Sequence, residues 1–194
     1  MICVILAADK NDKPFWNTIS RELEKDFSII RAYDGKLYTS VNVAEMVLTD
    51  INSFRQFNTE STIMVFKNID GADIDSITGN SQIAIVDSAN DNLMHHVANM
   101  QIPAITCGLS ARDTVTLSSI SVDGAVVNLQ RGMTGFYGDE IEPQEIPAII
   151  EEEADHFALM SATVISLLCK KQPEEHNIAS NNKKTHDHTS NANA

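Results

Sequence analysis

Residues that could bind phosphate follow the first apolar run of the sequence, in the segment LAADKNDKPF (6–15). A phosphate loop lies between a strand and a helix, and it presents backbone N–H groups and a lysine to the ligand. Asn11 and Lys13 are suited to such a loop. The segment has no glycine, however, and Asp9 and Asp12 place negative charge where a polyphosphate would lie. These residues favour an acidic loop over an intact phosphate site.

Polar side chains also follow three later apolar runs: Asn68, Asp87 and Ser110 each stand at or just beyond the end of one. The carboxyl ends of parallel strands meet at one edge of a sheet, and ligands of α/β proteins gather there. We therefore expect Asn11, Lys13, Asn68, Asp87 and Ser110 to line any ligand site that the protein retains.

Among the three cysteines, Cys107 has the best position for a nucleophile, because it stands near the end of an apolar run. A reactive cysteine needs a neighbouring base, a cation or a helix terminus to lower its pKa. No histidine stands at the end of a neighbouring predicted strand. Cys107 is therefore interpreted, like Cys3 and Cys169, as a reduced core residue of a cytosolic protein.

The histidines do not form a metal-binding pattern. His95 and His96 are adjacent, so on a helix they point to different sides and cannot hold one ion together. His186 and His188 flank an aspartate in a polar segment near the C-terminus, which is typical of a solubilising tail or an expression scar. We expect no metal site.

The charge balance limits the partners. The chain has 27 acidic and 14 basic side chains, which gives a net charge of −13. Binding to nucleic acid or to an anionic membrane surface requires a basic face. The apolar segment 156–169 is too short and too mixed to span a bilayer, and the opening MICVILAA lacks the basic residues of a secretory signal. We expect a cytoplasmic protein that binds neither nucleic acid nor a membrane.

Buried strands and amphipathic helices alternate in the first part of the sequence, which is typical of an α/β domain with a mostly parallel sheet. Apolar residues recur every four positions in the first helix, as one buried stripe requires. The polar segment 69–80 is expected to be a connection with a short helical turn. The predicted strands are 2–8, 27–33, 62–69, 82–88 and 102–108, and the predicted helices are 14–27, 41–54 and 90–100.

The pattern changes in the second part. Two β-type runs joined by Asp123-Gly124 predict a hairpin. The segments expected here are the hairpin 114–130, a glycine-spaced loop 131–147, a long helix 148–171 and a disordered polar tail 172–194. The whole predicts one three-layer, Rossmann-like domain over 1–171, with a small C-terminal β-hairpin extension and a long C-terminal helix.

Taken in order over residues 1–168, these segments resemble the central ATP-binding domain of the Mur ligase family, which adds amino acids to peptidoglycan precursors. The opening loop resembles the family's G-T-N-G-K-T loop and keeps Asn11 and Lys13. IMVFKNID resembles the strand before its T-N-I segment and keeps Asn68 and Ile69. IAIVDSANDNL, IPAITCGLSARDTV and DHFALMSATVISLL resemble, in turn, its V-x-N-x-D-D strand end, its V-x-T-F-G-L segment and the helix that begins with G-x-H-N.

The chain departs from the family where ATP would react. In that family ATP phosphorylates a carboxylate, and an amine attacks the acyl phosphate. Here Asp9 and Asp12 replace the loop glycines, Pro14 replaces the hydroxyl that holds Mg²⁺, and no Asp-His pair follows Asn68. The family's C-terminal domain, which closes over ATP, is not expected either. Transition-state stabilisation in phosphoryl transfer requires these parts together, so the resemblance implies a non-catalytic relative.

The leading hypothesis is therefore a Mur-ligase-like domain without ligase activity, which binds or scaffolds a protein partner in the cytoplasm and needs no cofactor. One alternative is an ATP- and Mg²⁺-dependent amide ligase completed by a partner chain. Another is a receiver-like or flavodoxin-like regulatory domain, with Asp9 and Asp87 as its strand-end acids.

Overall fold

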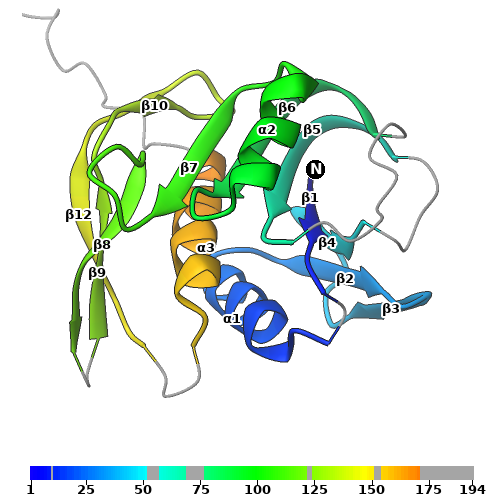
Figure 1. Ribbon diagram of the computed structural model, residues 1–194. Coiled ribbons are helices and arrows are strands. Elements are labelled where there is room, and N and C mark those ends of the chain that lie inside the picture. Colours follow the sequence, from blue (N-terminus) through cyan, green and yellow to red (C-terminus); the bar gives the residue numbers. More distant parts are fainter. Residues whose placement is uncertain (10, 52–56, 69–76, 122–123, 151–153, 171–194) are drawn as a thin grey trace, which may run out of the picture.

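The computed structural model describes residues 1–9, 11–51, 57–68, 77–121, 124–150 and 154–170 (Figure 1). The strands are β1 (Ile2–Ala7), β2 (Ile29–Tyr33), β3 (Lys36–Thr39), β4 (Met46–Asp50), β5 (Phe57–Phe66), β6 (Ile77–Asp87), β7 (Ala104–Gly108), β8 (Val115–Ser121), β9 (Gly124–Leu129), β10 (Met133–Thr134), β11 (Glu140–Ile141) and β12 (Gln144–Ala148). The helices are α1 (Lys13–Glu24), α2 (Asp91–Met100) and α3 (His156–Cys169).

Ten strands form one mixed sheet in the order β12-β9-β8-β7-β6-β5-β1-β4-β2-β3. All neighbouring pairs from β8 to β2 are parallel, and the pairs at the two ends of the sheet are antiparallel. The central strand, β1, is buried along its whole length because it lies between β4 and β5 and is covered on both faces. The predicted α/β class with a mostly parallel sheet is confirmed.

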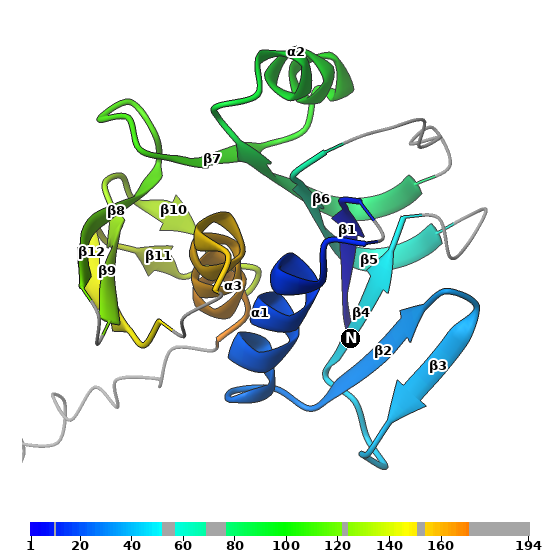
Figure 2. The same ribbon diagram turned by 60° about the horizontal axis from the view of Figure 1, so that its bottom comes forward.

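Helices cover both faces of the sheet, as the three-layer prediction requires. Helices α1 and α3 lie side by side against one face, and α2 lies on the other (Figure 2). Helix α3 is apolar nearly all round because it packs between α1 and the strands β7 and β8. Two apolar cores result, and the larger of them reaches from α1 through the central strands to β9 and α3.

The helix predicted over 41–54 is wrong. The chain forms strand β4 instead, which inserts between β1 and β2. Met46, Leu48 and Asp50 are buried. A short apolar run that is buried on both faces has no period that separates a strand from a helix, so its place in the sheet decides. Strand β3, which forms a hairpin with β2, has no counterpart in the prediction.

The C-terminal part follows the prediction with shifted boundaries. The predicted hairpin is present as β8 and β9, and it continues the main sheet because β8 starts beside the end of β7. The segment predicted as a loop over 131–147 contains β10, β11 and most of β12, and the last helix begins at His156 rather than 148. The connection predicted over 69–80 is wrong for its last four residues, because β6 already begins at Ile77 and pairs there with β5. Its residues 69–76 and the tail 172–194 lie outside the described residues.

Candidate functional site

Strands β1 and β5 are neighbours, but the chain leaves their carboxyl ends in opposite directions. After β1 it runs through α1 towards β2, and after β5 it continues to β6 on the other side (Figure 1). In an open α/β sheet this divergence is the usual place of a ligand site. The residues that follow Ala7 and Phe66 therefore form the candidate site.

Lys67, the first residue after β5, occupies the centre of this place. Its Nζ donates a hydrogen bond to Asp12 Oδ2 at 2.6 Å and another to Asp155 Oδ2. It also lies 5.2 Å from the centroid of the Phe15 ring, within reach of a cation–π interaction. The three charged side chains are only partly accessible, at 23%, 23% and 16% for Lys67, Asp12 and Asp155. We call Asp12, Lys67 and Asp155 the ion triad.

Both acids of the ion triad are also helix caps. Asp12 Oδ1 accepts a hydrogen bond from Phe15 N at the start of α1, at 3.2 Å. Asp155 Oδ1 accepts one from Ala158 N at the start of α3, at 2.7 Å. Each carboxylate thus uses one oxygen for a helix and the other for Lys67. The positive ends of two helix dipoles are filled by the protein's own anions.

The loop after β1 has also used its backbone donors. Asn11 N donates to Asp9 Oδ1 at 2.8 Å, and Asp12 N donates to Asp9 O at 3.0 Å. Lys13 N donates to Asn11 O at 2.8 Å. Pro14 has no N–H, and Phe15 N is held by Asp12. A phosphate would therefore have to displace internal hydrogen bonds from Asn11 to Phe15.

The two carboxylates hold Lys67 in its charged form. Burial by itself lowers the pKa of Lys67, but its hydrogen bonds to Asp12 and Asp155 and the charges of these two acids outweigh this effect and raise the pKa. The ammonium group is therefore a fixed cation at neutral pH. It pairs with both acids, so the ion triad keeps one net negative charge, and the ammonium group is not available as a base or a nucleophile.

The residues predicted to line a ligand site all lie at this carboxyl edge, but on four strand ends. Asn11 and Lys13 follow β1 and are exposed, and Asn68 follows β5, where its N–H donates to Ala7 O at 3.1 Å. Asp87 ends β6, and Ser110 follows β7.

The spacing of the strands separates these residues into two groups. Strand β7 is three strand spacings from β1, which is about 14 Å. Asn11, Lys13 and Asn68 can therefore meet one small group, whereas Ser110 cannot meet that group as well. The carboxylate of Asp87 accepts a hydrogen bond from Ala89 N at 3.0 Å, and the Ser110 hydroxyl accepts one from Arg112 N at 3.2 Å.

The cysteines are core residues, as predicted from the sequence. Cys107 is fully buried, and burial together with the charges of Asp113 and Asp87 raises its thiol pKa. Burial raises the pKa of Cys3 to about 11 and that of Cys169 to about 12. None of the three thiols is a nucleophile at neutral pH.

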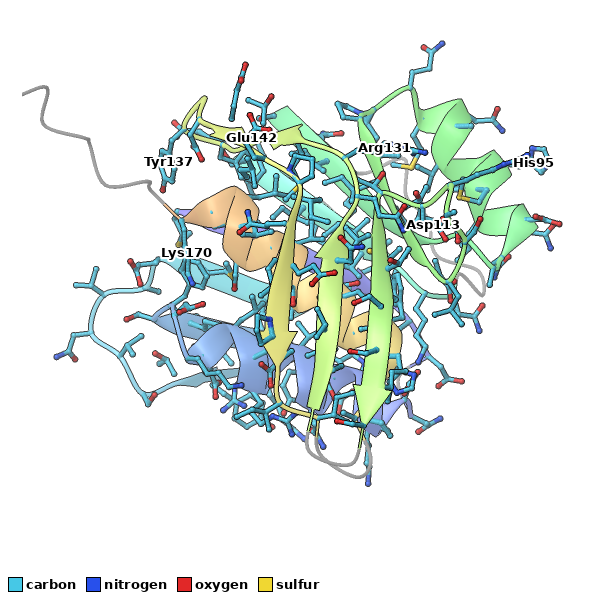
Figure 3. The ribbon with its side chains drawn as sticks, turned by 90° about the vertical axis from the view of Figure 1, so that its left-hand side faces the viewer. His95, Asp113, Arg131, Tyr137, Glu142 and Lys170 are labelled. Carbon is cyan, nitrogen blue, oxygen red and sulfur yellow. The ribbon has the colours of Figure 1, made fainter. Side chains whose placement is uncertain are left out.

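The loop after β7 is closed by its own polar groups. Asp113 is buried and accepts a hydrogen bond from Ser110 N at 2.9 Å. Its carboxylate lies so close to Gly108 that a Cβ there would come within 2.5 Å of Asp113 Oδ2, which explains the glycine. Arg131 lies beside this loop and donates to Arg112 O at 2.7 Å (Figure 3).

The described residues contain no cluster of three or more metal-ligating side chains. His95 and His96 lie on α2 and are exposed, and His95 projects away from the sheet (Figure 3). Within the described ranges, no helix is both long and apolar enough to cross a membrane.

The ion triad was not expected from the sequence. Lys67 carries one local signal, since it is a charged residue directly after an apolar strand at the ligand edge. Asp155 lies 88 positions further along the chain, and no local pattern relates the two. Only the packing of α3 beside α1 brings this acid to Lys67.

These features define an α/β domain whose ligand edge is filled by internal ion pairs. No protein-family model matches the sequence, and no curated protein matches it. Among solved structures, the fold is similar to that of a UDP-N-acetylmuramoyl-L-alanyl-D-glutamate–2,6-diaminopimelate ligase, a Mur ligase, at 11% identity and a TM-score of 0.47. The match covers 85% of this chain and 42% of the ligase, so the chain spans less than half of that enzyme.

Proposed function

We propose that this protein is a non-catalytic, Mur-ligase-like domain that acts as a cytoplasmic binding or scaffolding protein. The observation that supports the proposal is the ion triad at the diverging ends of β1 and β5. Asp12 and Asp155 occupy both helix N-termini, and Lys67 is committed to them. Carboxylates therefore occupy the helix N-termini, where a nucleotide phosphate would bind most favourably.

The loop supports the same proposal. Its donors from Asn11 to Phe15 are engaged internally, and Pro14 offers no hydroxyl to Mg²⁺. The net charge of −13 adds a long-range repulsion of nucleotides. A protein partner, rather than a nucleotide cofactor, is the ligand that we expect. We also propose a link to cell-wall precursor metabolism, which the resemblance of the sequence to the Mur ligase family supports.

The test is the thermal stability of the protein with and without ATP and Mg²⁺. A ligand that binds only the folded state raises Tm, and we expect no rise for the native chain. A rise that disappears in Lys13→Ala would show a working nucleotide loop, and the non-catalytic proposal would then be wrong.

A second variant tests why the site is closed. In Asp12→Asn/Asp155→Asn both caps are kept, but the internal anions are removed, so the charge of Lys67 and the positive ends of the two helix dipoles are no longer compensated and attract an external anion. We expect inorganic phosphate to raise Tm of this variant more than that of the native chain. An equal response of both proteins would show that the carboxylates are not what excludes phosphate.

A further inference from the structure

Strand β3 is an open edge of the sheet. It is the last strand in the sheet order, and all four of its residues are exposed. Among the described residues, no helix crosses its outer side in Figure 2. Leu37 is 66% exposed and Tyr38 is 38% exposed, so the strand offers apolar side chains on both of its faces. Open edges of this kind accept further strands unless charge or proline blocks them.

The opposite edge of the sheet is blocked in the usual way. Strand β12 carries Glu145 and Pro147, and proline has no N–H to donate to an added strand. Strand β3 has no proline and one charged residue, Lys36. The two edges therefore differ in their ability to add a strand.

The hairpin geometry shows which backbone groups of β3 are free. Asp34 and Gly35 both have positive φ, at 51° and 67°, and join Tyr33 to Lys36 as a two-residue turn. Tyr33 and Lys36 are then a hydrogen-bonded pair, and the pattern alternates along the strands. Lys36 and Tyr38 point their backbone groups towards β2, and Leu37 points its N–H and C=O outwards.

The side chains of β3 divide between the two faces. Tyr38 stacks on Tyr33 at 5.0 Å between ring centroids, and Tyr33 contacts Trp16 of α1 at 5.9 Å. Tyr38 and, two positions away, Lys36 therefore lie on the face of α1. Leu37 lies on the opposite face.

We propose that β3 pairs with β3 of a second copy, antiparallel and about a two-fold axis at Leu37. In this register Leu37 faces Leu37 of the other copy, and their outward N–H and C=O groups form a hydrogen-bonded pair. Lys36 of each copy lies opposite Tyr38 of the other on the face of α1, which matches a cation to an aromatic ring. Lys36 Nζ lies 3.8 Å from Asp34 Oδ2, and this ion pair is exposed and weak, so it leaves the ammonium group able to turn to the ring. A shift by two residues towards the turn would instead place Lys36 against Lys36, which like charge disfavours.

The interface is small. Stable dimers bury about 800 Å² on each partner, and a pair of four-residue strands contributes only part of this area. Each copy also carries a net charge of −13, so the two copies repel each other at low salt. The dimer is therefore reversible, dependent on concentration and favoured by salt that screens this repulsion. The inference goes beyond the proposed function and is independent of it, because neither the ion triad nor a nucleotide takes part in the pairing.

Analytical ultracentrifugation of the full chain from about 10 μM to about 1 mM, the range of a weak interface, tests the proposal. We expect the weight-average mass of the native protein to rise towards that of a dimer. Leu37→Lys and Leu37→Glu should each stay monomeric, because like charges would meet at the two-fold axis. Leu109 is the matched control, since it is 80% exposed on the loop after β7, and Leu109→Lys should dimerise like the native chain.

The register is tested by mixing the two variants. Equal amounts of Leu37→Lys and Leu37→Glu should form a mixed dimer, because residue 37 faces residue 37. A native protein that stays monomeric, a dimer that survives Leu37→Lys, or a mixture that stays monomeric would each overturn the proposal. These measurements contain no nucleotide, so their outcome is distinct from that of the ATP test.

Discussion

Lys67 connects three separate parts of the chain at one point. Its ammonium group donates hydrogen bonds to the capping aspartates of α1 and α3, and its backbone directly follows β5. The Phe15 ring beneath it stacks on Phe157 of α3 at 6.1 Å, so apolar packing and ion pairing act at the same place. At the residue scale, Lys67 is a structural cation.

Replacing Lys67 by methionine should destabilise the fold. The change keeps most of the apolar stem but leaves Asp12 and Asp155 close together without a cation. Loss of hydrogen bonds to charged groups costs about 1–3 kcal/mol, and we expect a decrease of that size in the free energy of unfolding by urea. Lys13→Met is the control: Lys13 is exposed, and we expect a change within about 0.5 kcal/mol. Equal effects of the two changes would contradict the role of Lys67.

The contribution of Lys67 should disappear in alkali. Its pKa is raised in the folded protein, so the charged form is favoured by folding. The stabilisation is then complete below the ordinary lysine pKa of about 10.4 and is lost as the pH rises through the folded value. We expect the difference in unfolding free energy between the native chain and Lys67→Met to be constant from pH 7 to about pH 10 and to shrink above it. A difference that already shrinks near pH 8 would contradict this assignment.

Helices α1 and α3 are positioned at their N-termini by one mechanism. Each begins with an aspartate whose Oδ1 accepts a backbone N–H and whose Oδ2 binds Lys67. In addition, Asp155 N donates to Thr18 Oγ1 at 3.3 Å, which connects the two helices directly. At the element scale, the loop that resembles a phosphate loop is a junction between two helices.

The two roles of Asp155 can be separated by substitution. Asp155→Asn keeps the cap and loses the charge, whereas Asp155→Ala loses both. We expect the alanine variant to be less stable than the asparagine variant by about 1 kcal/mol, the usual worth of a cap, as measured by urea unfolding. Asn90→Ala is the control for a cap without an ion pair, because Asn90 caps α2 through Leu93 N. If Asp155→Asn were as unstable as Asp155→Ala, the helix cap would not contribute to the stability of the fold.

The larger core spans both ends of the sheet in the part of the chain that the structure describes. It joins α1, the central strands, β9 and α3, although β7 and β8 pair over only two residue positions. Packing of α3 against both β7 and β8 adds to these few hydrogen bonds in joining the two ends of the sheet.

A single cooperative unfolding transition should follow from this continuous core. The single tryptophan, Trp16, reports on α1. The three buried thiols, Cys3, Cys107 and Cys169, report together on β1, β7 and the end of α3. We expect the urea midpoints from Trp16 fluorescence, thiol reactivity and far-UV circular dichroism to coincide. Separate midpoints would show that the β8–β9–β12 end unfolds independently.

The sequence correctly predicted those elements whose hydrophobic pattern fits only one type of secondary structure. The stripe of Phe15, Ile19 and Leu23 can only be a helix with one buried face, and it is α1. The uniformly apolar run from Ile2 to Ala7 is the central strand. The segment 41–54 was predicted as a helix because its apolar residues at 43, 47, 48, 51 and 54 match a helical period. Only insertion between β1 and β2 makes Met46–Asp50 a strand.

For the candidate site, the sequence by itself determined the acidic loop, its missing glycines and the edge on which Asn11, Lys13, Asn68, Asp87 and Ser110 lie. The tertiary structure decided which charges meet. Asp12, Lys67 and Asp155 are distant in the chain, and each looks like an ordinary surface charge in its own segment. Their pairing arises only when α3 packs beside α1, because partly buried charges are stable where opposite charges and hydrogen bonds replace water.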